Sequence, residues 1–219
     1  MGSAPVVVYL DDDLMVIDKP SGVLTIPDGY DPEKPHLMKI LRPQYGKLWI
    51  VHRLDKSTSG LVILARNKDA HRNLNDQFSQ RLVKKVYWAI VHGIPDWDRK
   101  EIDQPLRSSV GRRKRTIIDA VDGKPARTSL QVLRRLVRYT LVEAQPETGR
   151  THQIRAHLYS VGHPILGDPL YGDREEGSII NRLALHAKLI TIDHPSSGEC
   201  ITFHAPEGED FAHLLQTLK

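Results

Sequence analysis

Apolar runs and alternating apolar and polar positions predict more strands than helices along this chain. Five segments carry strand-like patterns bounded by turn-forming residues: 6–10, 14–20, 61–66, 86–93 and 128–145. Three aspartates between the first two segments predict a turn, and Pro20 and Gly22 end the second. The continuous apolar run in the third is short enough for a buried strand, and the fifth is long enough for a hairpin.

Two other segments have helical spacing. In residues 67–78, Asn67 is a candidate N-cap and apolar residues recur at four-residue intervals. In residues 151–162, apolar residues share one helical face and Gly162 follows as a stop signal. Because no strand–helix–strand rhythm repeats along the chain, the pattern predicts an α+β fold. We expect a mixed, largely antiparallel central sheet with flanking helices.

Length and composition fit one globular domain. The chain has 219 residues, of which 40% are hydrophobic, so residues 1–219 are predicted to form a single domain with its own core. The lone Cys200 cannot form an internal disulfide and favours a reducing compartment. No run approaches the ~20 apolar residues of a membrane span, and no signal-peptide pattern begins the chain. The sequence therefore predicts a cytoplasmic protein.

Charge adds one local feature. The net charge is +4, and the run RSSVGRRKR at 107–115 holds five cations with no acid between them. Four of these cations are consecutive: Arg112, Arg113, Lys114 and Arg115. Such a run is either an ordinary solvated loop or a loop that contacts phosphates, since Lys and Arg that neutralise phosphates dominate nucleic-acid affinity.

The eleven histidines do not form a recognisable metal motif. His152 and His157 are five residues apart, which separates them by about 140° on a helix, so they do not share a face. By contrast, His152 and Arg155 are three apart and are expected to share one. The chain contains no HExxH or CxxC motif, no GxSxG elbow, and no phosphate-loop or dinucleotide fingerprint. We therefore expect no metal and no nucleotide cofactor, which suits an enzyme acting on a nucleic-acid base.

Several ordered motifs make a family resemblance specific. They are VIDKPSGVLTIP (16–27), HRLDKSTSGLVILARN (52–67), KKVYWAIVHG (84–93), ETGRTHQIRAHLYSVGHPILGDPLYG (147–172), RLALHA (182–187) and HAP (204–206). With these motifs the chain resembles the RluA-type family of RNA pseudouridine synthases from about residue 14 to 206. The resemblance implies a pseudouridine synthase-like catalytic domain, an isomerase activity and an RNA substrate. Many relatives carry an accessory N-terminal RNA-binding domain, and this sequence is expected to lack one.

The resemblance also assigns candidate catalytic residues. On pattern alone, Asp55 caps or bends a turn, and Tyr87 is a core residue of a strand. The resemblance makes Asp55 the carboxylate that either attacks the sugar or removes a proton from the ribose, and the sequence leaves both open. It makes Arg155 the cation that keeps this carboxylate ionised. It places the ring of Tyr87 on the flipped uracil, with the hydroxyl able to assist the late proton removal from C5.

Further residues are candidates for binding RNA. The resemblance implies that Arg53 enters the place of the flipped nucleotide and holds a phosphate, and a salt bridge to Asp55 is its alternative. Arg150 has either a phosphate role at a helix N-terminus or a structural ion pair. His52 is expected to serve packing or a backbone hydrogen bond. The partner is expected to be a structured stem-loop of ribosomal or transfer RNA, and the protein a monomer.

Two function classes remain at this point. The first is an RNA pseudouridine synthase without a cofactor, and the second is a non-catalytic RNA-binding module on the same fold. A pure binder has no physical need for Asp55, Tyr87 and Arg155 together. The sequence therefore favours the enzyme.

Overall fold

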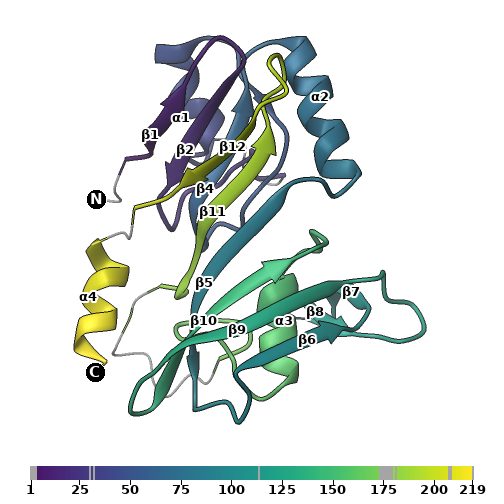
Figure 1. The fold of residues 1–219 in the computed structure, drawn as a ribbon, viewed down its shortest axis with the longest axis vertical. Helices are drawn as coiled ribbons and strands as arrows, with labels where there is room; N and C mark the ends of the chain where they lie inside the picture. The colour runs from purple at the N-terminus through teal and green to yellow at the C-terminus, as the bar shows by residue number, and fades with distance from the viewer. Residues whose placement is uncertain are drawn as a thin grey trace. The chain divides into compact units, whose positions relative to one another are not determined.

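The structure is a computed structural model that describes residues 4–29, 31, 33–112, 114–172, 180, 182–206 and 209–218. The chain divides into two compact units (Figure 1). The first comprises residues 1–84 and 187–206, and the second comprises residues 85–186 and 207–219. That residues 1–219 form one domain stays a prediction.

The first unit is built around strands that the apolar runs predicted. Its elements are β1 (Val6–Leu10), β2 (Leu14–Lys19), α1 (Leu37–Tyr45), β3 (Trp49–Ile50), β4 (Ser59–Ala65), α2 (Lys68–Ser79), most of β11 (Leu185–Asp193) and β12 (Cys200–His204). The strand order is β1-β2-β4-β11, with β3 beside β4 and β12 beside β11. Every residue of β4 is buried, as expected for a strand that is apolar on both faces.

Helix α2 begins where the capping signal predicted. The Asn67 side chain accepts a hydrogen bond from the backbone N–H of Ala70 at 2.8 Å. Ala70 and Leu74 are buried against the core of the unit. Helix α1 was not predicted, and it contains Pro43, which disfavours a helix interior.

The second unit contains a second set of paired strands and two helices. Its elements are most of β5 (Lys84–His92), β6 (Arg99–Asp103), β7 (Leu106–Val110), β8 (Arg115–Ile118), β9 (Arg127–Arg135), β10 (Tyr139–Pro146), α3 (Gln153–Ser160) and α4 (Glu209–Thr217). The order β5-β10-β9-β6 is antiparallel throughout, and β7 and β8 form a separate two-stranded hairpin. The predicted hairpin in residues 128–145 is thus confirmed as β9 and β10, and the α+β prediction is confirmed as well.

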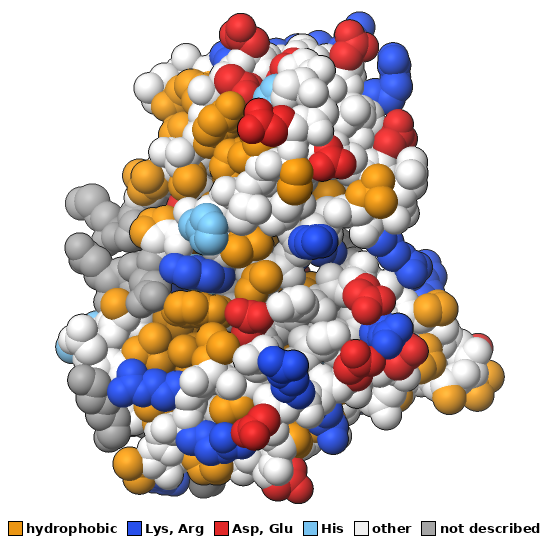
Figure 2. Space-filling view, in the orientation of Figure 1, with side chains coloured by type: hydrophobic (Ala, Val, Ile, Leu, Met, Phe, Trp, Pro, Cys, Tyr) orange, Lys and Arg blue, Asp and Glu red, His pale blue; other side chains and the backbone are white. Residues whose placement is uncertain are grey.

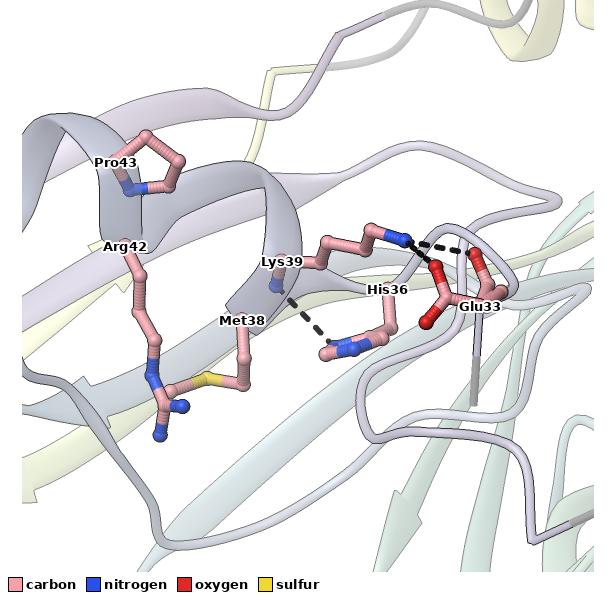
Figure 3. A pocket seen from close by; sticks show the side chains of 6 residues that line it. All are labelled: Glu33, His36, Met38, Lys39, Arg42 and Pro43. Carbon is pink, nitrogen blue, oxygen red and sulfur yellow. Dashed lines mark hydrogen bonds and ion pairs between the residues drawn. The ribbon is translucent and has the colours of Figure 1, made fainter. Parts of the chain in front are cut away.

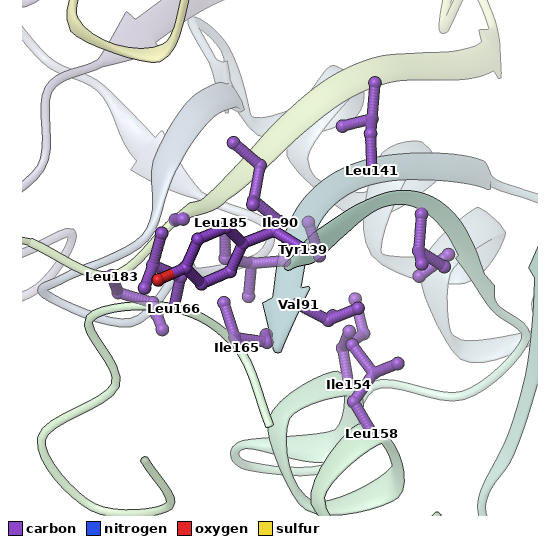
Figure 4. Packing of buried hydrophobic residues seen from close by; sticks show 14 of the residues in the cluster. Ile90, Val91, Tyr139, Leu141, Ile154, Leu158, Ile165, Leu166, Leu183 and Leu185 are labelled. Carbon is purple, nitrogen blue, oxygen red and sulfur yellow. The ribbon is translucent and has the colours of Figure 1, made fainter. Parts of the chain in front are cut away.

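Helix α3 supplies apolar residues to the core of the second unit. Ile154 and Leu158 lie in one cluster with Val91 of β5 and Ile165 (Figure 4). The predicted stop at Gly162 is confirmed, because its φ is +83° and the His163 N–H donates to the Leu158 carbonyl at 3.0 Å.

The predicted start of α3 was two residues early. The helix begins at Gln153, and His152 before it is left-handed, with φ +54° and ψ +21°. The expectation that His152 and Arg155 share a helical face was therefore wrong. Among the described helices of the chain, none is both long and apolar enough to cross a bilayer.

Candidate active site

Asp55 lies in the loop that leads from β3 into β4. The Thr58 N–H donates to the Asp55 carbonyl at 3.1 Å, which closes a tight turn just before β4 begins. The neighbouring Leu54 is buried, and both of its backbone groups bind one hydroxyl. Thr25 Oγ1 donates to the Leu54 carbonyl at 3.1 Å and accepts from the Leu54 N–H at 3.2 Å. The backbone next to Asp55 is therefore fixed in place.

A buried lysine supports the same loop from the other side. Lys19 is fully buried, and its ammonium donates to the carbonyls of Pro20 and Val23, both at 2.9 Å, and of Lys56 at 3.3 Å. Ser21 Oγ donates to the Ser57 carbonyl at 2.8 Å. The motif at 16–27 thus has a physical purpose that the sequence did not reveal. It holds the Asp55 turn.

The two residues that precede Leu54 differ in their surroundings: His52 packs within the first unit, and Arg53 is exposed. The His52 Nε2 accepts a hydrogen bond from the Ile63 N–H at 2.9 Å, and its ring stacks on Phe78 with centroids 4.6 Å apart. The expected packing and backbone roles of His52 are confirmed. Arg53 is exposed and forms no ion pair with any side chain that the structure describes. The salt bridge to Asp55, which was the alternative role of Arg53, is therefore not formed.

Arg155 is buried in the second unit and paired with a carboxylate that the sequence analysis did not single out. Its Nε and Nη2 donate to the two oxygens of Asp168 at 2.7 Å and 2.8 Å. The side chains are 3% and 0% exposed. Asp168 Oδ1 also accepts from the N–H groups of Leu170 and Tyr171. This two-point contact fixes the orientation of the guanidinium as well as its charge.

Tyr87 is half-buried on β5, opposite Ala144 of β10. It packs against the edge of the apolar cluster of the second unit. Arg150 is also partly buried, and its Nε donates to the Pro125 carbonyl at 3.1 Å. Within the described residues, Arg150 forms no ion pair, so the structural alternative proposed for it is replaced by a backbone contact.

The basic run has three different local environments. Arg112 and Lys114 are exposed in the turn of the β7–β8 hairpin, and Arg113 lies outside the described residues. Arg115 is half-buried, with its guanidinium 5.5 Å from the ring centroid of Tyr171. Arg107 pairs with Asp119 and Asp122 at 2.8 Å and 3.2 Å. Figure 2 shows Lys and Arg side chains interspersed with acids rather than gathered in one patch on the face drawn there.

Two other clusters of polar residues in the described part of the chain contain none of the predicted site residues. A hollow of about 500 Å³ beside α1 is lined by Glu33, His36, Met38, Lys39, Arg42 and Pro43 (Figure 3). Its lysine is paired with its glutamate at 2.6 Å. In the described part of the chain, one group has the spacing of metal ligands: Asp11, Asp13 and His194. Asp11 and His194 already bind each other at 2.8 Å.

The predicted residues are distributed over both units. Arg53 and Asp55 share one loop of the first unit, whereas Tyr87, Arg150, Arg155 and the basic hairpin belong to the second. Within the second unit, the guanidinium groups of Arg155 and Arg115 converge on one ring, that of Tyr171. No sequence signal pointed to Asp168, because the burial of Arg155, which requires an acidic partner, is visible only in the structure.

Comparisons with known proteins agree on one family. A family model described as RNA pseudouridylate synthase matches residues 13–160. The chain is 41% identical over 202 residues to the dual-specificity RNA pseudouridine synthase RluA of Escherichia coli O6:H1, with 92% of each chain covered. It is 38% identical to the ribosomal large subunit pseudouridine synthase D of Neisseria meningitidis, over 97% of this chain and 61% of that protein.

A solved structure is similar as well. The human RNA pseudouridylate synthase domain containing 1 has a TM-score of 0.80 and 32% identity, over 93% of this chain and 83% of that one. The family model spans more than half of this chain, and the relative from Escherichia coli covers nearly all of it. The chain belongs to the RluA-type RNA pseudouridine synthases, which isomerise uridines in RNA to pseudouridine.

Proposed function

We propose that this protein converts particular uridines in a structured stem-loop of ribosomal or transfer RNA to pseudouridine, with Asp55 as the central carboxylate. The reaction breaks the bond between N1 and C1′, turns the uracil, and joins C5 to C1′. C5 loses its proton and N1 gains one, so the product is an isomer of the substrate. Because nothing is oxidised, hydrolysed or added, the reaction calls for no cofactor.

Asp55 supplies the ionised carboxylate next to the sugar. It either attacks C1′ or removes a proton from the ribose, and both routes require the charged form. The observation that carries the proposal is that hydrogen bonds fix the loop of Asp55. The motif that contains this loop is similar to that of the family. Thr25 binds both backbone groups of Leu54, and buried Lys19 binds the carbonyl of Lys56. A fixed backbone on both sides of Asp55 supports precise placement of its carboxylate.

Arg155 and Tyr87 act with Asp55. The guanidinium of Arg155 favours the charged form of the catalytic carboxylate, and its orientation is set by Asp168. The ring of Tyr87 stacks on the turned-out uracil, and its hydroxyl assists removal of the C5 proton. The reaction thus draws on residues of both units, and we propose that the units work together as one catalytic domain.

The arginines serve to expose and hold the nucleotide. A base inside a stacked loop cannot present C1′ to a carboxylate, so it must be turned out of the stack. Arg53 enters the vacated place, which fits its exposure and its lack of an ion pair with described side chains. Arg150, Arg112, Arg113, Lys114 and Arg115 contact phosphates.

Two further proposals concern the setting of the reaction. The names of the relatives describe a dual-specificity RNA pseudouridine synthase and a synthase of the large ribosomal subunit, which supports RNA, and ribosomal RNA in particular, as the substrate class. We propose transfer RNA as the other candidate. We propose that the protein acts as a monomer in the cytoplasm. A non-catalytic RNA-binding role on the same fold is the alternative, and the presence of Asp55, Tyr87 and Arg155 favours the enzyme.

Pseudouridine mapping in cellular RNA tests this function. Ribosomal and transfer RNA are compared between cells with the protein, cells without it, and cells that express it again. We expect one or a few stem-loop uridines to lose the modification without the protein and to regain it on re-expression. Identical maps in all three cells would contradict the proposal.

A further inference from the structure

The β7–β8 hairpin, which carries the basic run, depends on another segment of the second unit for its place. A two-stranded hairpin is only marginally stable alone. The register of its ladder shifts between Arg107 and Val110. In the described pairing, Arg115 and Ile117 have partners on β7, whereas Thr116 between them has none. The backbone of Thr116 is buried and needs hydrogen bonds from elsewhere.

The hydroxyl of Tyr171 supplies both of these bonds. It accepts from the Thr116 N–H at 2.8 Å and donates to the Thr116 carbonyl at 2.9 Å. Tyr171 is 3% exposed and lies in a small apolar cluster with Leu106 of β7 and Ala156 of α3. Burial raises the pKa of the Tyr171 hydroxyl, so it stays protonated and able to donate. The Tyr171 side chain therefore supplies the backbone hydrogen bonds that Thr116 does not form with β7.

The ring of the same tyrosine supports two arginines. The guanidinium carbon of Arg155 lies 5.2 Å from the ring centroid, and that of Arg115 lies 5.5 Å from it. Both distances are within the range of cation–π attraction. The backbone N–H of Tyr171 also donates to Asp168, the partner of Arg155. Tyr171 thus touches the basic hairpin at one end and the Arg155–Asp168 pair at the other.

We propose that Tyr171 is a positioning residue with two separable actions, one of which serves RNA binding and the other the chemical step. Its hydroxyl holds the basic hairpin in the position that meets RNA phosphates. Its ring and backbone hold Arg155 in the orientation that supports the catalytic carboxylate. This proposal rests on the proposed function, because it assigns the hairpin to RNA and Arg155 to catalysis.

Steady-state kinetics on RNA with 5-tritiated uridine separate the two actions. Tyr171→Phe removes the hydroxyl and keeps the ring, so two buried backbone groups of Thr116 lose their partner. We expect KM for RNA to rise about 5- to 30-fold, the factor that corresponds to the loss of such hydrogen bonds, with kcat nearly unchanged. Tyr171→Leu also removes the ring, so kcat should fall as well.

Tyr159→Phe is the matched control. Tyr159 packs on Tyr171 with centroids 5.7 Å apart, and its hydroxyl forms no hydrogen bond with a described residue. This variant should retain the kinetics of the wild type. If Tyr171→Phe matches it, or lowers kcat per folded protein without a change in KM, the proposal is wrong. A loss of folded protein alone would lower the apparent kcat and leave KM unchanged.

A measurement on the unaltered protein covers the case in which Tyr171→Phe does not fold. Hydrogen exchange is followed in the wild type with and without RNA. We expect RNA to slow exchange in β8 and also in residues 165–172, which carry Asp168 and Tyr171. Slowing in β8 alone would contradict the proposal that Tyr171 connects the hairpin to the Arg155–Asp168 pair. A wild type that binds RNA but releases no tritium would instead contradict the proposed function.

Discussion

The Arg155–Asp168 pair shows how a single buried residue is fixed for a task. A guanidinium that is 3% exposed is stable only with a partner that neutralises its charge and satisfies its donors. Asp168 supplies the negative charge and accepts two short hydrogen bonds from the guanidinium, and two backbone N–H groups hold the carboxylate in turn. The contact with Asp168 therefore holds the guanidinium of Arg155 in one orientation.

The first prediction at this scale concerns Asp168. Replacing it by Asn leaves a buried positive charge without its counter-charge, so Asp168→Asn should lower the free energy of unfolding by about 3 to 5 kcal/mol. Asp98→Asn is the control, because Asp98 pairs with Arg135 at 2.8 Å but is 84% exposed. That change should cost about 0 to 1 kcal/mol. Urea denaturation checks both values, and equal losses would contradict the structural role of the buried pair.

Tyr87 carries the second prediction. Tyr87→Phe keeps the stacking ring and removes the hydroxyl, so the base can still be turned out while proton removal at C5 loses its assistant. We expect product formation to fall by at least about 100-fold, the usual contribution of a general acid or base, with RNA affinity preserved. Tritium release and a binding isotherm measure the two quantities. Normal turnover would leave only the stacking role.

The sequence predicted the role of one residue near Asp55 and missed four residues whose contacts hold the proposed site. His52 was assigned to packing or a backbone bond, and both contacts are present. Lys19, Thr25, Asp168 and Tyr171 were not singled out, although all four lie in motifs quoted for the resemblance. Their roles arise from contacts with residues that are 13 to 55 positions away. No local pattern reveals such contacts.

At the scale of elements, the first hairpin is secured at its turn by one carboxylate. Asp11 accepts hydrogen bonds from the N–H groups of Asp13 and Leu14 and from the Tyr9 hydroxyl, and it pairs with His194. Burial raises the pKa of Asp11, but these hydrogen bonds outweigh it and lower the pKa from 3.8 to about 2. The β1–β2 turn is thereby joined to the turn before β12.

A pH dependence of stability follows. A carboxyl group with a lowered pKa in the folded state stabilises the fold above its ordinary pKa and loses that contribution as the pH falls toward the folded value. From about pH 4 to about pH 2, the wild type should therefore lose more stability than Asp11→Asn. Asp12→Asn alters a solvent-exposed neighbour and should behave like the wild type. Denaturation midpoints across this range test the expectation, and parallel curves for wild type and Asp11→Asn would contradict it.

The basic hairpin gives a prediction on salt dependence. Arg112 and Lys114 are its exposed cations, whereas Arg115 is held against Tyr171. Changing the first two to Gln should reduce the slope of log affinity against log salt by about 1.4 to 1.8, because each phosphate contact contributes about 0.7 to 0.9. Arg72→Gln on α2 is the control, since Arg72 is equally exposed but lies in the first unit. An unchanged slope in the double variant would mean that the turn is only solvated surface.

Elements with strong periodicity were predicted, and those defined by tertiary contacts were not. The capping signal of Asn67 and the continuous apolar run in β4 are local, and both predictions were correct. In the structure, the helix that contains Arg155 begins two residues later than predicted, because His152 is left-handed. No pattern in that segment indicated this conformation. Helix α1 contains a proline, and the β7–β8 ladder is irregular and completed by Tyr171.

At the scale of the whole molecule, the residues that we propose for the reaction come from both compact units. Asp55 and Arg53 come from the first, and Tyr87 and Arg155 from the second. Each unit fixes its own contribution by internal contacts, through Lys19 and Thr25 in one and Asp168 and Tyr171 in the other. Which residues take part stays a prediction from the family resemblance, and the sequence did not predict the contacts that hold them.

We propose that Asp55 makes this protein an enzyme rather than an RNA-binding module. Asn has nearly the shape of Asp but neither attacks C1′ nor accepts a proton well. Asp55→Asn should therefore release less than about one hundredth of the tritium that the wild type releases from 5-tritiated uridine in RNA. Its binding isotherm for the same RNA should match that of the wild type. Tritium release by Asp55→Asn at a rate near that of the wild type would contradict the account.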